Sequence, residues 1–522
     1  MNVVGGVLVA ILLALAYGAQ MSRWLRVLQR EHYDPRSMLR FLARWSSPLV
    51  AGAKARPRAR PHRPFTLSHA FIVAMAAAIV LRAYTLLAVV TAGYGLFCPQ
   101  GLSIRGKTGP LEWTRRLRAV ALLAGGLSLV VAALGAFTSE PFLGAVVVVL
   151  AVPPVLGLST RLLRPLEERR AQRFVGQAVT RLKRVSPTVV AITGSYGKTS
   201  TKHYLAELLS GDGGVVASPR SYNNRAGLSR SINENLAEGT RVFIAEMGTY
   251  GPGEIRALTS WCAPEIAVIT AIGPVHLERM KTLDVIEAAK HEITERATTV
   301  VLNVDDARLA QWLDPLRAAG KRVIAVGSTT AEAEVRVTHD AHRWALIVEG
   351  VNLGGLDEVV GVQPTNLACA LGAALALGVD RATLLERVRR VTPVANRLNV
   401  VTADSGVVVI DDTFNANPAS ARVALKVLSS LDLTGRRVVV TPGLIELGGE
   451  QNSENLLLAQ RVAAVPAELV VVARTNVEAL EAGYGKPLKR FDRRDEATAW
   501  IRSSLVSGDA VLYLNDLPDH YP

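Results

Sequence analysis

The sequence predicts an α/β protein in which an apolar, helical region precedes two domains built on mostly parallel sheets. Three observations support this prediction. Long apolar stretches are confined to the first 160 residues. From residue 188 onward, short β-branched strands alternate with helical segments, which is typical of parallel sheets covered by helices on both faces. All of the chain's excess positive charge lies ahead of that boundary.

The charge is distributed unevenly. Residues 1–185 hold 25 of the 59 basic and 6 of the 45 acidic side chains, so their net charge is +19 and that of the remainder is −5. The high overall charge of +14 therefore does not indicate nucleic-acid binding. Cys98, Cys262 and Cys369 are too far apart for a zinc or redox motif, which predicts a reducing compartment and no structural metal cluster.

Four apolar stretches predict a membrane region over residues 1–160, namely residues 3–19, 70–97, 119–137 and 142–158. Basic residues follow the first stretch, occupy the segment 98–117 and resume after residue 158. The positive-inside rule places these basic segments in the cytoplasm. We therefore expect a multi-pass protein of the cell membrane, with its N-terminus outside and its C-terminal two thirds in the cytoplasm.

The stretch 70–97 has to begin and end on the cytoplasmic side, and Arg82 lies in its middle. Because an arginine at mid-bilayer costs several kcal/mol, we predict two short or re-entrant halves that turn near Arg82, with one long span as the alternative. The proline-rich basic segment 54–64 predicts a loop that is solvated, attracted to anionic headgroups, or both. Residues 161–185 predict a basic amphipathic helix that links the membrane region to the rest.

A strand predicted over residues 188–192 leads into Gly-Ser-Tyr-Gly-Lys-Thr-Ser at residues 194–200, and a helix is predicted over 202–209. A glycine-rich turn between strand and helix directs backbone N–H groups toward a phosphate. Lys198 supplies a positive charge for the β- and γ-phosphates, and the Thr199 hydroxyl can ligate Mg²⁺. The turn is shorter than a usual P-loop, because Ile192 stands where that motif has its first glycine. The segment predicts a nucleotide site, with a plain turn and a solvated lysine as the alternative.

Further strands are predicted over residues 242–245, 266–270, 300–302 and 323–326, and ligands of such sheets bind beyond the carboxyl ends of the strands. Glu246 ends the first of these strands, where an acid opposite Thr199 suits Mg²⁺; a carboxylate facing water is the alternative. His276 is either functional or structural. Lys290, in the helical run 285–297, is a solvated lysine on spacing alone.

A second alternation predicts strands over residues 407–410, 438–441, 469–472 and 510–514. Asp412 follows the first of them and is either a turn cap or functional.

Six motifs along the chain occur in the order seen in the Mur ligase family. They lie at residues 194–202, 222–227 (Tyr-Asn-Asn-Arg-Ala-Gly), 246–248 (Glu-Met-Gly), 273–278 (Gly-Pro-Val-His-Leu-Glu), 288–293 (Ala-Ala-Lys-His-Glu-Ile) and 411–418 (Asp-Asp-Thr-Phe-Asn-Ala-Asn-Pro).

Over roughly residues 186–520 the chain therefore resembles the Mur ligases, and the last motif is most similar to the D-alanyl-D-alanine-adding, MurF-type branch. Together with the membrane region and linker helix predicted above, the resemblance implies a membrane-anchored variant of the family in four parts. These are a membrane region (1–160), a basic linker helix (161–185), a central P-loop ATPase domain (186–393) and a Rossmann-like C-terminal domain (394–522).

The resemblance also implies a reaction, that of an ATP-dependent peptide ligase of the EC 6.3.2 type in cell-wall peptidoglycan synthesis, acting through an acyl phosphate with ATP and Mg²⁺. It implies that Lys198, His276 and Lys290 are catalytic, that Thr199 and Glu246 bind one Mg²⁺, and that His276 and a carbamylated Lys290 hold a second. The implied nucleotide-binding residues are Gly194, Ser195, Gly197, Lys198, Thr199, Ser200, Asn366, Arg397, Asp412 and Asn415, and the implied substrate-binding residues are Asn223 and Asn224. Arg397, Asp412 and Asn415 act only if the C-terminal domain closes over the nucleotide.

Three features depart from the family. Membrane segments replace its N-terminal UDP-binding domain, Asn455 stands in place of a histidine, and Leu-Asn-Asp-Leu-Pro-Asp-His-Tyr at residues 514–521 replaces Lys-Gly-Ser. We therefore expect the same chemistry on a changed carboxylate, lipid-linked or part of an envelope polymer, with an amino acid or peptide amine. Membrane lipids and cell-wall synthesis proteins are the expected partners. The alternatives are a membrane-tethered ATP-binding scaffold for cell-wall enzymes and a polyglutamate-synthase-like ligase.

Overall fold

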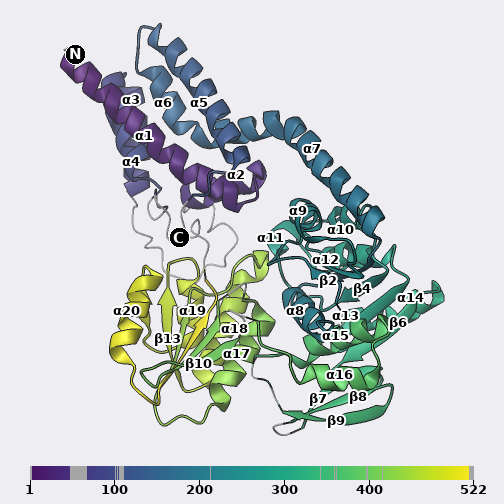
Figure 1. Cartoon of the computed structure of the whole chain (residues 1–522). Coiled ribbons are helices and arrows are strands. Elements are labelled where there is room, and N and C mark those ends of the chain that lie inside the picture. The colour runs from purple at the N-terminus through teal and green to yellow at the C-terminus, as the bar shows by residue number, and fades with distance from the viewer. Residues whose placement is uncertain are drawn as a thin grey trace. The chain divides into compact units, whose positions relative to one another are not determined.

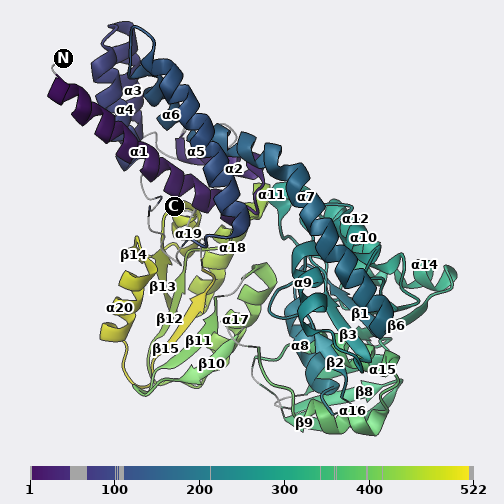
Figure 2. The same cartoon turned by 45° about the horizontal axis from the view of Figure 1, so that its top comes forward.

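A computed structural model of the chain describes residues 3–46, 67–99, 102, 104, 111–211, 213–340, 343–357, 359, 361–394, 398–413 and 416–516. These residues form two compact units, one that ends at Arg170 and one that runs from Ala171 to Asp516. Figures 1 and 2 show the helices and strands of each unit from two directions.

The first unit is helical. Its helices are α1 (Val3–Arg30), α2 (Pro35–Ser46), α3 (Leu67–Val80), α4 (Tyr84–Phe97), α5 (Arg115–Ala136), α6 (Leu143–Leu150) and the first half of α7 (Val152–Val185). Small and branched side chains of α1, α3, α4 and α6 pack together, while large apolar side chains such as Leu122 and Leu129 of α5 stay exposed. Of the described helices, α1 and α5 are each long and apolar enough to cross a membrane.

The turn predicted near Arg82 is confirmed. α3 and α4 have 14 residues each and are separated by a short turn in which Arg82 has a φ of 52°. The ring of Phe71 packs edge-on against Tyr94, and the Thr91 hydroxyl lies 3.5 Å from the sulfur of Met75. These pairings make the two helices an antiparallel hairpin, so the alternative of one long span is wrong.

The stretch 142–158, predicted as one span, is divided into two helices. α6 ends at Leu150, α7 begins at Val152, and the two helices are bent by 70° relative to each other. Pro153 and Pro154 lie in the first turn of α7. Proline is tolerated there because an N–H group in the first turn would have no intrahelical acceptor in any case. The helix predicted over 161–185 is confirmed, but it begins earlier than expected and is continuous with the apolar segment.

Polar side chains of α1 hold the C-terminal end of α4. The guanidinium of Arg23 donates to the carbonyls of Gly95 at 2.7 Å and Leu96 at 2.6 Å, and the Gln20 amide donates to the carbonyl of Cys98 at 2.7 Å. The last carbonyls of a helix have no partner within the helix, so these bonds satisfy groups that would otherwise be buried without one.

The second unit opens with a nine-stranded sheet in the order β2-β3-β1-β4-β5-β6-β7-β8-β9. Its strands are β1 (Thr188–Thr193), β2 (Val215–Ala217), β3 (Val242–Glu246), β4 (Ile266–Ile269), β5 (Thr299–Asn303), β6 (Arg322–Gly327), β7 (Val335–Asp340), β8 (Arg343–Val348) and β9 (Val351–Asp357). Neighbours from β2 to β7 are parallel, as predicted, whereas β7, β8 and β9 pair antiparallel. This antiparallel edge was not predicted.

Helices cover both faces of this sheet (Figure 1). They are α8 (Lys198–Leu208), α9 (Arg225–Asn235), α10 (Glu254–Thr259), α11 (Leu277–Met280), α12 (Leu283–His291), the 3₁₀ turn η1 (Glu292–Thr294), α13 (Ala307–Ala310), α14 (Leu313–Ala318), α15 (Pro364–Ala376) and α16 (Arg381–Val388). Alternate side chains of β1 enter different cores, since Val190 and Ile192 pack with α8 and α15, and Val189 and Ala191 with α9, α10 and α12. The strand is therefore apolar along its whole length.

A six-stranded sheet follows, in the order β10-β11-β15-β12-β13-β14. Its strands are β10 (Asn399–Thr402), β11 (Val408–Asp412), β12 (Arg437–Thr441), β13 (Ala467–Val472), β14 (Lys489–Phe491) and β15 (Ala510–Leu514). Its helices are α17 (Pro418–Ser430), η2 (Gly448–Glu450), α18 (Gln451–Ala464), α19 (Val477–Tyr484) and α20 (Arg494–Ser504). The four strands predicted here are confirmed, and only the β10–β11 pair is antiparallel.

Candidate functional site

The turn after β1 lies at the carboxyl edge of the larger sheet. Gly194 and Gly197 have φ angles of 152° and 80°, and a Cβ added at Gly197 would lie 2.1 Å from Oδ1 of Asn366. Only glycine fits such a backbone at such a close approach. α8 begins at Lys198, earlier than predicted, so Lys198 and Thr199 lie in its first turn. The first N–H groups of this helix have no intrahelical acceptor and suit an anion.

The turn is braced against the loop that carries His276. The Ser195 hydroxyl accepts the N–H of Gly273 at 2.9 Å and donates to the carbonyl of Gly273 at 3.0 Å. The Lys198 ammonium donates to the carbonyl of Gly194 at 2.6 Å. The predicted phosphate-binding turn and the His276 loop are therefore fixed to each other through a serine side chain.

Glu246 lies at the centre of a buried polar network, with 1% of its surface exposed. Its Oε2 is 3.0 Å from Thr199 Oγ1 and 3.0 Å from Lys202 Nζ, and its Oε1 accepts from the Asn223 amide at 3.1 Å. Burial acts to raise the pKa of Glu246, but the charges of Lys202 and Lys198 and the hydrogen bonds from Lys202 and Asn223 outweigh burial, so its pKa lies below the ordinary value. Glu246 is an ionised carboxylate beside the Thr199 hydroxyl.

Lys202 is a member of this network that sequence reasoning missed. Its ammonium also donates to the backbone carbonyl of Arg220, and its side chain is buried. Lys202 follows Thr199 by three residues on α8, a spacing that places two side chains on one helix face. That spacing, together with the acid predicted opposite Thr199, could have identified Lys202 as a neighbour of Glu246.

His276 precedes α11 with a φ of 53°. Its Nδ1 is 2.5 Å from Oε2 of Glu446, and its ring lies 4.6 Å from the ring of Tyr250 between centroids. A histidine that binds a metal commonly shares its other ring nitrogen with a carboxylate. This arrangement leaves Nε2 as the nitrogen suited to a metal. The sequence predicted neither Glu446 nor Tyr250 as a neighbour of His276.

Lys290 is buried, with 2% of its surface exposed, so the alternative of a solvated lysine is wrong. Its helix is shorter than the predicted run 285–297, since α12 ends at His291. Among the residues that the structure describes, the Lys290 ammonium has no hydrogen-bond or ion-pair partner. Burial, and then the positive charge of Lys198, hold the pKa of Lys290 well below its ordinary value. Both effects act against the ammonium form of this side chain.

Thr199 and Glu246 suit a Mg²⁺ ion as they stand, whereas Lys290 would need a carbamate on its amine to bind one. Octahedral Mg²⁺ holds its ligands at about 2.1 Å, so two adjacent ligand oxygens lie about 3 Å apart. The Thr199 and Glu246 oxygens are separated by 3.0 Å. At the second position an ammonium would repel a cation, whereas a carbamate on the Lys290 amine would supply an anionic oxygen. No group of three or more His, Cys, Asp or Glu side chains within the described part of the chain is arranged to hold a metal.

Two aspartates after β5 each hold a loop through backbone N–H groups. Asp305 accepts the backbone N–H groups of Ser328 at 2.6 Å and Thr330 at 2.9 Å. Burial acts to raise the pKa of Asp305, but hydrogen bonds from the 328–330 loop lower it to about 2. Asp306 accepts the N–H of Ile272 at 2.7 Å and so holds the start of the loop that leads to His276.

The structure gives the two predicted substrate residues local contacts. Asn223 binds Glu246, as described above. Asn224 is the N-cap of α9, and its Oδ1 accepts the N–H of Gly227 at 2.9 Å. Their role toward a substrate stays a prediction.

The remaining predicted nucleotide residues come from three elements. Ser200 is buried in α8. Asn366, at the start of α15, is buried with its side chain against Gly197. Asp412 is buried at the end of β11. Arg397 and Asn415 lie outside the described residues.

Asn455, predicted from the sequence to stand in place of the family's histidine, is buried in the C-terminal part of the chain. Its Oδ1 accepts the N–H of Leu444 at 2.7 Å, and its Nδ2 donates to the carbonyls of Leu444 at 2.9 Å and Gln451 at 2.7 Å. All of these partners are backbone groups on either side of the loop that carries Glu446. Asn455 therefore holds that loop.

Comparison with known families identifies two matching regions. The Mur ligase middle domain matches residues 192–354, and the Mur ligase glutamate ligase domain matches residues 396–514. Among curated relatives, the UDP-N-acetylmuramoyl-tripeptide--D-alanyl-D-alanine ligase of Mycobacterium tuberculosis is 30% identical over 347 residues, which are 63% of this chain and 67% of that protein.

Solved structures share the fold. MurF ligase of Thermotoga maritima, solved in complex with ADP, superposes with a TM-score of 0.58 at 24% identity over 66% of this chain and 80% of that one. Escherichia coli FolC, solved with DHPP and ADP, superposes with a TM-score of 0.50 at 20% identity over 65% of this chain and 89% of that one. The two family matches together span strands of both sheets of the second unit.

Proposed function

Because the chain belongs to the Mur ligase family, whose members are ATP-dependent peptide ligases, we propose that it joins a carboxylate to an amine through an acyl phosphate at the cytoplasmic face of a membrane. The observation that carries this proposal is the pairing of Thr199 and Glu246, 3.0 Å apart at the end of a P-loop turn. A hydroxyl and an ionised carboxylate at this spacing suit the magnesium ion that accompanies a nucleoside triphosphate.

Each predicted residue then has a task. The N–H groups at the start of α8 and the Lys198 ammonium bind the β- and γ-phosphates, and Thr199 and Glu246 hold one Mg²⁺. His276 and a carbamylated Lys290 hold a second. When bound, the two ions neutralise charge on the transferring phosphoryl group. Asn366, Arg397, Asp412 and Asn415 would complete the nucleotide site.

The reaction balances in two steps. A carboxylate oxygen of the substrate attacks the γ-phosphorus of ATP, and the bond between that phosphorus and the β,γ-bridging oxygen breaks. ADP leaves, and the substrate becomes an acyl phosphate. The amine then attacks the acyl carbon, and inorganic phosphate departs with the oxygen that came from the carboxylate. A proton is released from the amine as the amide forms.

The domain and membrane assignments are part of this proposal. We assign residues 1–160 to the membrane region, 161–185 to the linker helix, 186–393 to the ATP-binding domain and 394–522 to the C-terminal domain. Support comes from α1 and α5, which are long and apolar enough to span, and from the exposed apolar side chains around them. The basic segments beside these helices favour a cytoplasmic catalytic part.

The residues ahead of the matched region support a proposal for the carboxylate substrate. The Mycobacterium tuberculosis relative is named for UDP-N-acetylmuramoyl-tripeptide and D-alanyl-D-alanine. In this chain the family matches begin at residue 192, and the residues ahead of them include apolar helices. We propose a lipid-linked or envelope-polymer carboxylate in place of the soluble nucleotide sugar, with an amino acid or peptide as the amine. The likeness to FolC is one of fold alone and favours no second function.

The test uses the full chain purified in detergent. ADP release is measured with D-alanyl-D-alanine and either a soluble UDP-muramyl peptide or its lipid-linked counterpart, at matched concentrations. Greater turnover with the lipid-linked substrate is expected. Full activity on the soluble substrate would reject the change of substrate, and no turnover with either would reject this pair.

The scaffold alternative is tested by Lys198→Ala. A ligase loses ATP turnover in this variant and keeps its other contacts. A scaffold that uses ATP to recruit enzymes would lose the capture of those enzymes together with ATP binding.

A further inference from the structure

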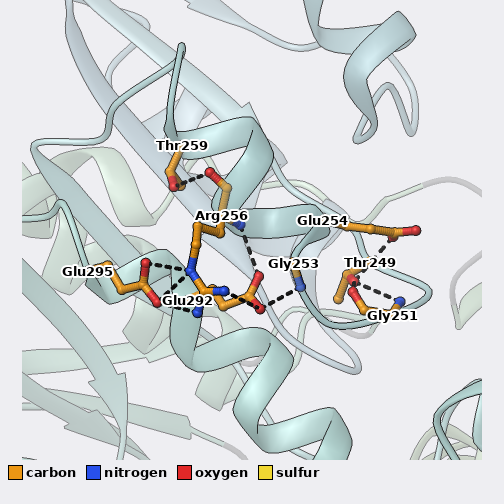
Figure 3. A network of polar contacts seen from close by, with 8 residues as sticks. All are labelled: Thr249, Gly251, Gly253, Glu254, Arg256, Thr259, Glu292 and Glu295. Carbon is orange, nitrogen blue, oxygen red and sulfur yellow. Dashed lines mark hydrogen bonds and ion pairs between the residues drawn. The ribbon is translucent and has the colours of Figure 1, made fainter. Parts of the chain in front are cut away.

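The carboxylate of Glu292 is buried and joins two segments that are far apart in the sequence, as Figure 3 shows. Its Oε1 accepts the N–H of Gly253 at 2.6 Å, and its Oε2 accepts the N–H of Arg256 at 2.9 Å. The Arg256 guanidinium is 3.7 Å from Oε1. Both carboxylate oxygens are thus bound to the start of α10, from a residue in the turn η1.

Capping of α10 explains part of this arrangement. The N-cap of α10 is Gly253, which has no side chain to accept the free N–H groups of the first turn. Glu292 takes that role from a distant segment. Capping alone, however, does not explain why the capping side chain comes from the segment that follows Lys290.

Glu292 lies two residues after Lys290, directly beyond the end of α12. The segment it binds is the loop that follows Glu246, and this loop contains Tyr250, whose ring packs on His276 at 4.6 Å. Glu254, the first residue of α10, accepts the N–H of Tyr250 at 2.7 Å and so ties this loop to the helix; its side chain is drawn in Figure 3. One carboxylate therefore connects the backbone next to Lys290 with the loop that supports His276.

We propose that Glu292 is a positioning residue that fixes the distance between Lys290 and the Tyr250–His276 pair, and so builds the second metal position. This inference rests on the proposed function, because it needs Lys290 and His276 to act on one cation. The backbone bonds at 2.6 and 2.9 Å make the connection short and two-pronged, which limits both translation and rotation of the loop.

The test compares Glu292→Gln with Glu295→Gln in the full chain. The glutamine side chain keeps the shape of Glu292 but turns an amide donor toward one of the two N–H groups. Glu295 is the matched control, because it binds the same Arg256 at 2.6 Å, is 38% exposed and, in the described contacts, accepts only from that side chain. Three quantities are measured: the ¹³C carbamate signal after incubation with ¹³C-bicarbonate, the Mg²⁺ concentration that gives half-maximal ATP turnover, and the KM for ATP at saturating Mg²⁺.

Glu292→Gln is expected to lower the carbamate signal and to raise the Mg²⁺ requirement about 10-fold or more, the range typical of residues that orient metal ligands. The KM for ATP at saturating Mg²⁺ should stay close to that of the wild type, and Glu295→Gln should match the wild type in all three. If Glu292→Gln fails to fold, Glu292→Asp, which keeps the charge but is one carbon too short to reach both N–H groups, is judged by the same measurements.

Two results would overturn the inference while leaving the proposed function intact. One is a folded Glu292→Gln protein with the carbamate signal and Mg²⁺ dependence of the wild type. The other is a lower melting temperature without any change in those two quantities, which would make Glu292 a helix cap only. A wild-type protein that shows neither carbamate nor ATP turnover would instead remove the proposed function, and this inference with it.

Discussion

The ion pair between Lys202 and Glu246 gives the sharpest stability prediction. Replacing Lys202 by Met removes the ammonium 3.0 Å from Glu246 Oε2 and leaves a carboxylate that is 1% exposed. At that separation and an effective dielectric constant of about 20, the lost attraction is roughly 5 kcal/mol. Lys198 and the Asn223 hydrogen bond continue to stabilise the charge, so we expect a net loss of about 3 kcal/mol, at the lower end for a broken buried pair.

The assay is thermal unfolding of the full chain in EDTA, so that no added Mg²⁺ compensates the carboxylate. A loss of about 3 kcal/mol lowers the melting temperature of a domain of 150–250 residues by about 6–12 °C. The double variant Lys202→Met with Glu246→Gln is the internal control. It lacks the uncompensated charge and should be more stable than the single variant by about 1 kcal/mol or more.

Two outcomes would refute this reasoning. A single Lys202→Met variant that melts within about 1 °C of the wild type would mean that the buried carboxylate needs no ammonium, since about 3 kcal/mol predicts a larger shift. A double variant no more stable than the single one would mean that Lys202 acts through packing of its stem rather than through its charge.

Three further predictions test other parts of the chain. Asp305→Asn should destabilise the protein by about 1 kcal/mol at neutral pH, a value reduced to allow for the partial exposure of Asp305. Because the pKa of Asp305 in the folded protein is lowered to about 2, this difference in stability should be present above about pH 4 and should vanish as the pH falls toward 2. Denaturation measured as a function of pH tests this prediction. Gly197→Ala places a Cβ 2.1 Å from Asn366 Oδ1 at a φ of 80°, and should weaken ATP binding about 10-fold or more by calorimetry while the melting temperature falls only slightly. Arg23→Ala removes donors from the carbonyls at the end of α4, so buried Cys98 should react faster with a maleimide, and peptide mass mapping locates the label.

Much of the fold follows from local patterns in the sequence. The strands at 188–192, 242–245 and 510–514 are apolar runs between turn residues, and each is a strand in the structure within one or two residues. β7, β8 and β9 were missed because they form an amphipathic edge, in which buried and half-buried side chains alternate along β8 and only one face is fully covered. Their pattern is therefore weaker than that of a strand buried on both sides.

The helix boundaries show where local pattern is insufficient. α8 begins at Lys198, four residues before the predicted start, because the helix continues directly from Gly197 and its first turn is polar. The division of 142–158 into α6 and α7 could not be read from apolar composition, which is continuous through Ala151. By contrast, the charge of Arg82 within an apolar stretch was sufficient to predict the α3–α4 turn.

The sequence predicted individual residues of the candidate site but few of the contacts between them. Thr199 and Glu246 were expected to face each other because the ends of neighbouring parallel strands meet at one edge, and they do so at 3.0 Å. Lys202, Glu446 and Glu292 were missed because their roles depend on side chains that converge from distant segments. The sequence likewise did not predict the burial of Lys290, because the spacing of residues on one helix does not show what packs against that helix.

The fate of the substrate's carboxylate oxygens tests the proposed ligation most directly. The full chain is incubated with ATP, Mg²⁺, the amine and a substrate whose reacting carboxylate carries ¹⁸O at both oxygens, and the released phosphate is analysed by mass spectrometry. Transfer through an acyl phosphate predicts one ¹⁸O atom in each phosphate, and no phosphate release from the Lys198→Ala variant. Phosphate that contains oxygen from water and none from the carboxylate would contradict the proposal.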